Sequence, residues 1–590
     1  MADCWWNLNP PLSEKTLEVL DEIGFKTMTP VQRVAIPLFL TNKDVAAEAV
    51  TGSGKTLAFV IPIIEILVKQ HKERKWKLHD ILAIIVTPTR ELAIQIDEVL
   101  QLFTKQLSFL RQSLFIGGTN PRQVVRKFKK DGGNIIIATP GRLDDIFCHK
   151  PDGLDLAACA KTLEVLVFDE ADRLLDMGFE KSINSILGFL PKQRRTGLFS
   201  ATQTDELEAL VRAGLRNPVR ITVKEKNSTT KVNQRTPVSL ENYYSVVLPE
   251  EKMSRLIAML RKNKDKKVII FFSTCASVDY FTVLLKIFLK DTTAMSLHGK
   301  MKNKRYKIFD AFRKLPSGVL VCTDVMARGV DIPEVHWVIQ FDPPSNASAF
   351  VHRCGRTARL GKQGNALLFL LPSEDSYVEF LAINQKVVLQ QYELDEVSDV
   401  IPKLRKHAIK DREIYEKGIR AFVSFIQSYS KHQCSLIFNL KELDIGKLAY
   451  GYGLLHLPRM PELKGRETVN FDPVDVDPVS IPYKDKIREK QRQLKLEQNK
   501  VEIPQTRRPK RKTENEAWSK KKEKLKRKDL KKKLDKENEI SRNKRKLNKL
   551  NEQEMDELTK EARLVKKLKS GKITKVEFER QVGDDDDKLE

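Results

Sequence analysis

Residues 49–56 of the chain read Ala49-Val50-Thr51-Gly52-Ser53-Gly54-Lys55-Thr56, the spacing of a phosphate-binding loop with alanine at its usual first glycine. Backbone N–H groups of such a loop curl around phosphate oxygens, and Gly52 and Gly54 permit close approach because they lack a Cβ. Lys55 can reach the β and γ oxygens of a nucleoside triphosphate, and the Thr56 hydroxyl can take a Mg²⁺ position. A flexible glycine-rich turn is the alternative. An apolar run from Leu57 to Leu67 weighs against it, because the loop should then open a helix whose positive end faces the phosphates.

The length and charge of the chain limit what it can be. A chain of 590 residues is too long for one hydrophobic core and predicts roughly three to four units of about 150 residues each. The formal net charge is +26, and residues 481–590 alone carry 37 Lys and Arg against 23 Asp and Glu, a net +14. This excess favours a polyanionic partner such as nucleic acid, because Lys and Arg that neutralise phosphates release counterions; a solvated basic run is the alternative.

The seven cysteines are scattered along the chain and show neither metal-ligand spacing nor a disulfide framework, which fits a reducing compartment. The N-terminus lacks a basic region followed by an apolar run, and no segment approaches about 18 uninterrupted apolar residues. We therefore expect a soluble intracellular protein without a membrane partner.

A short segment ahead of the phosphate loop carries candidate groups for reading a base. Gln32 lies about twenty residues before the loop, and Phe25 lies just upstream of it. A side-chain amide offers a donor and an acceptor that match the N6 and N7 edge of adenine, and an aromatic ring can stack on the base. Alone, the segment is an ordinary turn before a helix. Its position relative to the loop makes Gln32 and Phe25 candidate adenine contacts.

Three apolar runs after the loop, residues 81–86, 114–116 and 135–138, read as buried strands that end in small, hydroxyl or Arg residues. Residues at strand ends face the ligand in an open α/β sheet, and N–H, hydroxyl and guanidinium donors suit a sugar-phosphate backbone. Taken singly, each is equally well explained as a plain turn. The candidate nucleic-acid contacts are Pro88, Thr89, Arg90, Gly117, Gly118, Thr139, Pro140, Gly141 and Arg142.

A further strand, residues 165–168, closes in Asp169-Glu170-Ala171-Asp172. A carboxylate beside a phosphate loop can hold Mg²⁺, and its neighbour can orient or deprotonate an attacking water. We assign the metal to Asp169 and the water to Glu170. A fifth strand, residues 196–199, ends in Ser200-Ala201-Thr202, whose hydroxyls either sense the nucleotide or act as simple caps.

Together these motifs resemble the first core domain of the DEAD-box RNA helicases, a family named after the tetrapeptide at 169–172. The resemblance spans some 170 residues, from Gln32 through the phosphate loop to Thr202. It implies a RecA-like fold, ATP and Mg²⁺ as cofactors, and RNA as the nucleic acid. It also implies that Asp172, Ser200 and Thr202 couple the nucleotide to the RNA-facing loops.

A second α/β domain is predicted after a polar stretch. Residues 224–237 contain few apolar residues and read as a linker. Strand signals then recur, interleaved with helical patterns, at 268–272, 293–297, 318–322, 336–341 and 366–371. Two similar α/β units in tandem imply a cleft.

Two arginine-bearing segments lie on this second unit, from Thr323 to Asp331 and from His352 to Arg359. Guanidinium groups brought from another domain to a γ-phosphate offset transition-state charge, although clustered arginines are more often surface ion-pair partners or RNA contacts. Both segments resemble the fifth and sixth motifs of the family. The resemblance implies that Arg356 and Arg359 approach the γ-phosphate.

The same resemblance assigns further residues of the second unit. It implies that Gly329 and Asp331 lie at the nucleotide, with Asp331 near the ribose. It places Arg305 and Thr323 on the RNA-facing side and gives His352 a coupling role.

The chain continues beyond the family core. Residues 414–438 form a helical pattern rich in aromatic residues, which more often marks a packed face than an RNA platform. Residues 401–480 resemble the small helical extension of DEAD-box helicases of large ribosomal subunit assembly. From residue 484 onward the charged sequence predicts an isolated helix or a segment that orders on meeting RNA. Its basic clusters at 507–512 and 520–528 are typical of nuclear import signals.

The predicted fold class is α/β, with two tandem RecA-like parallel-sheet domains, then a small helical extension and a basic, largely helical or disordered tail. The expected divisions are an N-terminal segment with the adenine-reading motif at 1–34, an ATP-binding domain at 35–222, a linker at 223–245, a C-terminal helicase domain at 246–400, the extension at 401–480 and the tail at 481–590.

We therefore expect an ATP-dependent RNA helicase that remodels or unwinds RNA, with pre-60S ribosomal RNA and particles as its partners. We also expect a monomer in the nucleus, within the nucleolus, that protein activators can stimulate. An ATP-gated RNA clamp or assembly scaffold is the rival, and intact Glu170, Arg356 and Arg359 argue against a catalytically dead one. A DNA helicase is a weaker alternative, because only RNA supplies a 2′-OH.

Deleting residues 484–590 should weaken RNA binding and flatten its salt dependence, because phosphate contacts supply affinity without sequence information. The expected slope change on single strands is roughly 0.7 per lost phosphate contact. RNA affinity measured across a salt series checks this, and ATP hydrolysis at saturating RNA should largely survive. Equal affinity and equal slope for the full and truncated chains would leave the tail as a solvated or protein-binding segment.

Overall fold

The computed structural model describes residues 4–50, 52–201, 208, 210, 211, 214–223, 225–226, 233–234, 237, 239–301, 304–326, 332, 334–358, 362–463 and 470–501. By its internal contacts the chain divides into one unit of Met1–Pro458 with Glu467–Glu502 and another of Arg459–Arg466 with Ile503–Glu590. The helices and strands described below all belong to the first unit.

The first sheet has seven strands in the order β3-β4-β2-β5-β6-β1-β7, and all of its strand pairs are parallel. Its strands are β1 (Val45–Glu48), β2 (Ala83–Val86), β3 (Gln112–Phe115), β4 (Ile135–Ala138), β5 (Val165–Asp169), β6 (Arg195–Ser200) and β7 (Val219–Thr222). β2 and β4 are buried at every position, which explains their unbroken apolar runs. β1 and β7 were not predicted, because four residues with small or alternating side chains give too weak a strand signal.

The helices of this domain are α1 (Glu14–Glu22), α2 (Pro30–Leu40), α3 (Lys55–Glu73), α4 (Arg90–Thr104), α5 (Pro121–Asp131), α6 (Pro140–His149), α7 (Leu156–Cys159), α8 (Ala171–Asp176) and α9 (Glu180–Phe189). α3 begins at Lys55, so the prediction that the phosphate loop opens a helix is confirmed. α2 runs across the expected boundary between residues 34 and 35, because the apolar face of this helix packs into the core of the same domain.

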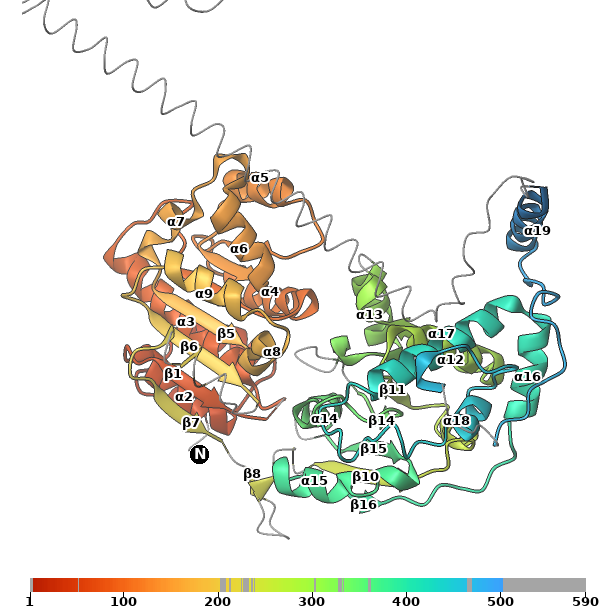
Figure 1. Ribbon diagram of the computed structural model, residues 1–590. Helices are drawn as coiled ribbons and strands as arrows, with labels where there is room; N and C mark the ends of the chain where they lie inside the picture. The colour runs from red at the N-terminus through yellow and green to blue at the C-terminus, as the bar shows by residue number, and fades with distance from the viewer. Residues whose placement is uncertain are drawn as a thin grey trace, which may run out of the picture. The chain divides into compact units, whose positions relative to one another are not determined.

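The second sheet repeats the strand order of the first, again with parallel pairs, as β12-β13-β11-β14-β15-β10-β16. Figure 1 labels β11, β14, β15, β10 and β16 side by side in this order. Its strands are β10 (Leu240–Val246), β11 (Lys267–Phe271), β12 (Ala294–Leu297), β13 (Gly318–Cys322), β14 (Trp337–Gln340), β15 (Gly364–Leu370) and β16 (Gln390–Gln391). Its helices are α11 (Lys252–Lys262), α12 (Cys275–Phe288), α13 (Lys304–Lys314), α14 (Ala347–Cys354) and α15 (Tyr377–Asn384). The prediction of two tandem RecA-like parallel-sheet domains is thus confirmed.

The predicted linker at 223–245 needs correction, because β10 takes its last residues into the second sheet. β10 pairs with β15 on one side and with β16 on the other. Its sequence, Leu-Glu-Asn-Tyr-Tyr-Ser-Val, is polar at several positions, so the strand is held by backbone pairing that the sequence pattern does not show. Earlier in the same stretch, β8 (Glu225–Lys226) pairs antiparallel with β9 (Asn233–Gln234).

The helical extension contains α16 (Ile401–Lys410), α17 (Arg412–Tyr429) and α18 (Ile445–Gly451), and α19 (Lys486–Val501) lies at the start of the tail. α17 ends nine residues before the predicted helical pattern does, and its aromatic residues Phe422, Phe425 and Tyr429 are buried, which confirms the packed-face interpretation. α17 packs along α12 of the second domain, and the two lie side by side in Figure 1. No helix in the described ranges is long and apolar enough to cross a membrane.

Gly451→Ala should destabilise the contact between the extension and the second domain. A Cβ at Gly451 would lie 2.3 Å from the backbone oxygen of Pro249, which cannot rotate away. We expect a loss of about 1–3 kcal/mol, measured by denaturant unfolding. Gly188→Ala in α9 is the matched control: its Cβ meets nothing within 4 Å, and alanine should add about 0.5–1 kcal/mol to the helix. A Gly451→Ala protein as stable as the parent would contradict this packing.

Candidate functional site

The phosphate loop forms a turn between β1 and α3. Gly52 and Gly54 have φ of +85° and +88°, a left-handed conformation that a side chain with a Cβ would strain. Ala49 donates its N–H to the Ser200 carbonyl at 3.0 Å, and Ser53 Oγ donates to the Val50 carbonyl at 2.7 Å. The loop is therefore tied to the end of the neighbouring strand β6. Thr56 follows in the first turn of α3 and is half-buried.

Lys55 is buried at the start of α3 and points back over the loop. Its Nζ donates to the Ala49 carbonyl at 3.0 Å and lies 3.7 Å from Glu170 Oε1. The ammonium group is thus held between the loop backbone and the carboxylate that ends the adjacent strand. A phosphate group could replace the carbonyl contact at little cost in reorganisation.

Asp169 and Glu170 stand at the carboxyl end of β5. Asp169 Oδ1 accepts the Glu170 N–H at 2.9 Å, and Glu170 has a left-handed φ of 49°, which turns its side chain away from the strand direction. Burial, together with the adjacent Glu170 carboxylate, raises the pKa of Asp169 to about 7. A crowded buried carboxyl pair of this kind favours a cation, and carboxylate and hydroxyl oxygens are the ligands that Mg²⁺ prefers. Asp169 and Thr56 therefore fit the predicted metal chemistry.

The structure ties Gln32 directly to the phosphate loop. Gln32 Oε1 accepts the Thr29 N–H at 2.8 Å, closing a capping box at the start of α2, and Nε2 donates to the Gly54 carbonyl at 3.0 Å. A Cβ at Gly54 would lie 2.5 Å from that Nε2. Phe25 is half-buried, and its carbonyl accepts the Trp5 indole N–H at 2.7 Å. Trp5 was not predicted, because its role depends on a contact across twenty residues.

Residues of the second domain reach this carboxylate cluster. His352, at the end of α14, is fully buried, and its Nε2 lies 3.0 Å from Asp172 Oδ2. Its Nδ1 lies 4.0 Å from Glu170 Oε2. Two residues predicted to couple the domains, Asp172 and His352, are thus in direct contact. Ser200, another of the four predicted coupling residues, is buried at the end of β6, beside the phosphate loop.

Arg353 lies within α14, and Arg356 follows in the turn just after this helix. Arg356 is 1% exposed, and its Nε donates to the His352 carbonyl at 3.3 Å. Arg353, which the sequence analysis did not assign, is fully buried and pairs with Asp324 through Nε and Nη2 at 2.5 and 3.0 Å. The pairing raises the pKa of Arg353 against the effect of burial. Arg353 therefore joins the two arginine-bearing segments of the second domain from inside.

Predicted RNA contacts gather around a cavity of about 400 Å³. Its lining includes eight of the predicted residues, namely Pro88, Thr89, Arg90, Gly117, Thr139, Gly141, Arg142 and Arg305. The lining also contains residues that were not predicted, namely Asp145, Arg173, Met177, Phe179 and Val325; Val325 lies within the segment from Thr323 to Asp331, and the other four lie outside the motifs read from the sequence. Gly118, Pro140 and Thr323 are absent from this lining.

The cavity is rich in guanidinium groups. Arg90 lies against Gly117 and Gly118, where a Cβ at Gly118 would overlap its guanidinium, so glycine is needed for that approach. Burial, with Arg305 nearby, lowers the pKa of Arg90, and burial also lowers that of Arg142. A site where arginines crowd one another favours an anion such as a phosphate.

Arg305 links the two domains at this cavity. Its Nη2 lies 2.8 Å from Glu91 Oε1, and both side chains are largely buried. On the same side, Arg313 Nη1 lies 3.1 Å from Glu98 Oε2. The contact joins α13 to α4.

Several predicted site residues lie outside the described part of the chain. They are Thr51, Thr202, Gly329, Asp331 and Arg359.

Comparison with known proteins places these features in a family. The profile of DEAD/DEAH box helicases matches residues 29–210, and that of the helicase conserved C-terminal domain matches residues 251–361. Two profiles described as the C-terminal extension and C-terminal tail of ATP-dependent rRNA helicase SPB4-like proteins match residues 411–460 and 483–581.

Relatives match over almost the whole length. ATP-dependent RNA helicase DDX55 of Mus musculus is 59% identical, with 98% of this chain and 95% of the relative covered. DEAD-box ATP-dependent RNA helicase 18 of Oryza sativa subsp. japonica is 44% identical, with 98% and 89% covered. The solved structure of Mss116p bound to single-stranded RNA and AMP-PNP is 29% identical, with a TM-score of 0.66 over 75% of this chain and 89% of that one.

Paired RecA-like sheets with a phosphate loop on the first sheet define an ATP-driven nucleic-acid helicase. The tetrapeptide Asp-Glu-Ala-Asp at 169–172 restricts this class to the helicases that carry the same four residues. The chain belongs to the DEAD-box family of ATP-dependent RNA helicases. It is accordingly an enzyme that hydrolyses ATP in an RNA-dependent manner.

His298, at the end of β12, provides a test of the local electrostatics on the second domain. Its Nε2 lies 2.9 Å from Asp279 Oδ1, and this contact, with Cys275, raises the pKa of His298 to about 9. A raised histidine pKa stabilises the fold below about pH 6.5, and that stability is lost as pH rises through about 9. Asp279→Asn should therefore reduce the free energy of unfolding by about 1 kcal/mol near pH 6, a modest loss because Asp279 is partly exposed. Near pH 10 the loss should almost vanish, because His298 is then neutral.

Unfolding at a series of pH values checks this prediction. The exposed Asp291→Asn is the control in the same domain and should show no such pH dependence. A loss for Asp279→Asn that does not change between pH 6 and pH 10 would contradict the ion pair.

Proposed function

We propose that this helicase remodels or unwinds ribosomal RNA of the pre-60S particle, in the nucleus and its nucleolus. Two findings support the substrate: the extension and the tail match profiles described for rRNA helicases, and the tail carries a net charge of +14. The basic tail would add affinity for any phosphate backbone, while the two domains act on the strand they hold.

The observation that carries the proposed mechanism is the meeting of Lys55, Glu170 and His352 in one buried cluster. We assign Lys55 to the β and γ phosphates, Asp169 with Thr56 to Mg²⁺, and Glu170 to the attacking water. Mg²⁺, when bound, would neutralise charge on the phosphate oxygens. Gln32 and Phe25 are assigned to the adenine base, next to the loop that Gln32 already contacts.

The second domain would complete the site when the two domains close on ATP. We assign Arg356 and Arg359 to the γ-phosphate, Gly329 and Asp331 to the ribose side, and the contact of His352 with Asp172 to coupling. Guanidinium groups supplied in this way accelerate phosphoryl transfer by about 10³ to 10⁵ in other enzymes.

The arginine-rich cavity would bind the sugar-phosphate backbone of single-stranded RNA. Closure would force a local bend that a duplex cannot accept, and hydrolysis of ATP would reset the protein. A monomeric state and stimulation by protein activators stay predictions.

The rival function is an ATP-gated RNA clamp that binds without productive unwinding. Comparing the rate of ATP turnover with the rate of strand displacement on the same duplex separates the two, because a clamp turns over ATP without displacing a strand. Replacing RNA with DNA tests the weaker DNA alternative. Crosslinking the protein to RNA in cells and sequencing the fragments tests the substrate: fragments outside pre-60S ribosomal RNA would contradict it.

The nucleotide assignments predict two separable defects. Lys55→Ala should weaken ATP binding, because the ammonium contact with the phosphates is lost, while Glu170→Gln should spare binding and slow hydrolysis by about 10² or more. Fluorescent-nucleotide affinity and RNA-stimulated ATP turnover measure the two effects. Parental hydrolysis by Glu170→Gln would remove Glu170 from the water-positioning role.

A further inference from the structure

The turn that precedes α14 is held from several directions. It comprises Phe341 to Asn346, between β14 and α14, and it carries no recognised sequence motif. Asp342 Oδ2 accepts hydrogen bonds from the Ser273 N–H and hydroxyl at 2.9 and 3.0 Å, and its carbonyl accepts one from Arg353 Nη1 at 2.7 Å. Asn346 ends the turn by capping α14, since its Oδ1 accepts the Ala349 N–H at 2.8 Å.

Two further bonds to this turn come from the extension. His432 Nε2 lies 2.7 Å from the Pro344 carbonyl oxygen, and the Gln433 N–H donates to the Ser345 carbonyl at 3.2 Å. Both residues lie just after α17, so the extension is hydrogen-bonded to the backbone immediately before Asn346, the N-cap of α14.

The bonding of His432 defines its tautomer. Nδ1 accepts the Cys434 N–H at 3.1 Å, so the ring proton is on Nε2, which donates to Pro344. The ring is buried and packs against Phe438, with ring centroids 3.8 Å apart. Burial lowers the pKa of His432, which keeps the imidazole neutral. The side chain therefore acts as a fixed donor between two backbone segments.

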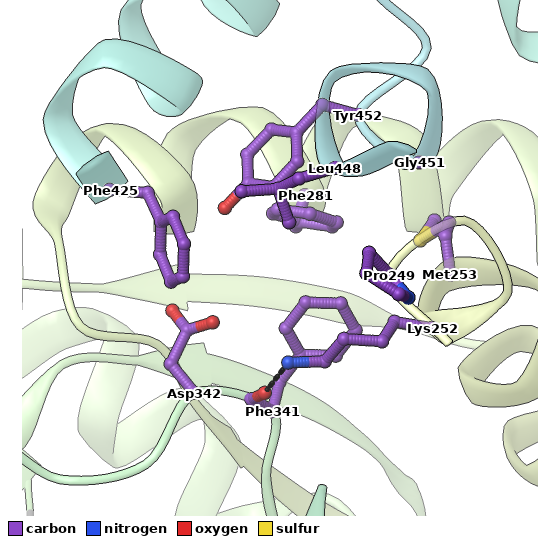
Figure 2. A pocket seen from close by; sticks show the side chains of 10 residues that line it. All are labelled: Pro249, Lys252, Met253, Phe281, Phe341, Asp342, Phe425, Leu448, Gly451 and Tyr452. Carbon is purple, nitrogen blue, oxygen red and sulfur yellow. Dashed lines mark hydrogen bonds between the residues drawn. The ribbon is translucent and has the colours of Figure 1, made fainter. Parts of the chain in front are cut away.

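The extension also covers the start of the turn. Figure 2 shows Phe425, Leu448 and Tyr452 over Phe341 and Asp342, with the Lys252 Nζ donating to the Phe341 carbonyl at 2.7 Å. The cavity left among these side chains is only about 10 Å³, close to the volume needed for one water. This tight packing leaves the turn little room to move.

We propose that His432 is a positioning residue for ATP hydrolysis, which fixes the turn before α14 and thereby sets His352 against Asp172. α14 is a single helix of eight residues, so a shift at its capped start moves His352 near its other end. The inference rests on the proposed coupling role of His352. It gives the helical extension a function at the nucleotide site in addition to any contact with RNA.

The test compares two substitutions of His432 in the full chain. His432→Leu keeps apolar volume but removes the donor, whereas His432→Gln keeps an N–H donor toward Pro344. We expect His432→Leu to lower the RNA-stimulated kcat about tenfold, and His432→Gln to recover most of that loss. ADP affinity should stay unchanged in both, because the phosphate loop belongs to the first domain. Leu436→Ala, in the same loop and 95% exposed, is the control and should behave as the parent.

A double-mutant cycle decides whether the effect passes through His352. In a His352→Ala background, His432→Leu should lower kcat no further, because the group it positions is already gone. The same tenfold loss in both backgrounds would overturn the proposal, as would a parental kcat for His432→Leu or a kcat for His432→Gln as low as that of the leucine variant.

A second pair of substitutions provides the test if His432→Leu does not fold, as judged by the lack of a cooperative unfolding transition. Gln433→Pro deletes the N–H that Ser345 receives and should lower kcat, while Gln433→Ala retains it and should not; equal rates for the pair would overturn the proposal. Failure of the proposed function is distinguishable, because it shows as crosslinked RNA fragments outside pre-60S ribosomal RNA or as ATP turnover without strand displacement, whatever the result at His432.

Discussion

The carboxyl ends of parallel strands meet at one edge of a sheet, and the rest of this structure depends on that constraint. In the first sheet, β1 delivers the phosphate loop, β5 delivers Asp169 and Glu170, and β6 delivers Ser200 to the same edge. Lys55 can then lie 3.7 Å from Glu170, although 115 residues separate them. No local interaction could hold an ammonium and a buried carboxyl pair in place at this separation. The sheet does so because β6 lies between β1 and β5 and fixes their register.

The second sheet has the same strand order but uses the equivalent edge differently. β10 takes the place of β1, and the helix after it begins with Lys252, as α3 begins with Lys55. Asp342 follows β14 as Asp169 ends β5. The connection from β10 to α11 contains no glycine, and the Lys252 ammonium donates to the Phe341 carbonyl under a cover of aromatic side chains. Both lysines are buried and donate to a backbone carbonyl, Lys55 to Ala49 and Lys252 to Phe341, but only Lys55 follows a glycine-bearing loop, and it lies beside the carboxylate cluster that contains Glu170.

The extension belongs to that second half in physical terms. Gly418 lets α17 approach the Tyr280 ring, whose hydroxyl donates to the Tyr452 carbonyl at 2.5 Å. His432, just after α17, binds the turn that precedes α14. The packing of the extension and the position of His352 are therefore linked by one connected series of contacts. Arg353 strengthens this series of contacts from within, because a buried guanidinium is tolerated only when its donors are paired, here with Asp324, Gln340 and the Asp342 carbonyl.

The sequence by itself determined the fold class, the order of the two domains and most of the residues that gather around the phosphate loop and in the arginine-rich cavity. Short local patterns carry these features: the spacing of glycines around Lys55, apolar runs such as Ile135–Ala138, and the charged tetrapeptide at 169–172. Only the tertiary structure decided that β10 is a strand, that Arg173 and Phe179 line the cavity, and that His432 holds Pro344. Each of these features depends on residues that are far away in the chain. The local sequence around a polar strand, an isolated arginine or a buried histidine has no periodicity or spacing from which its contacts could be predicted.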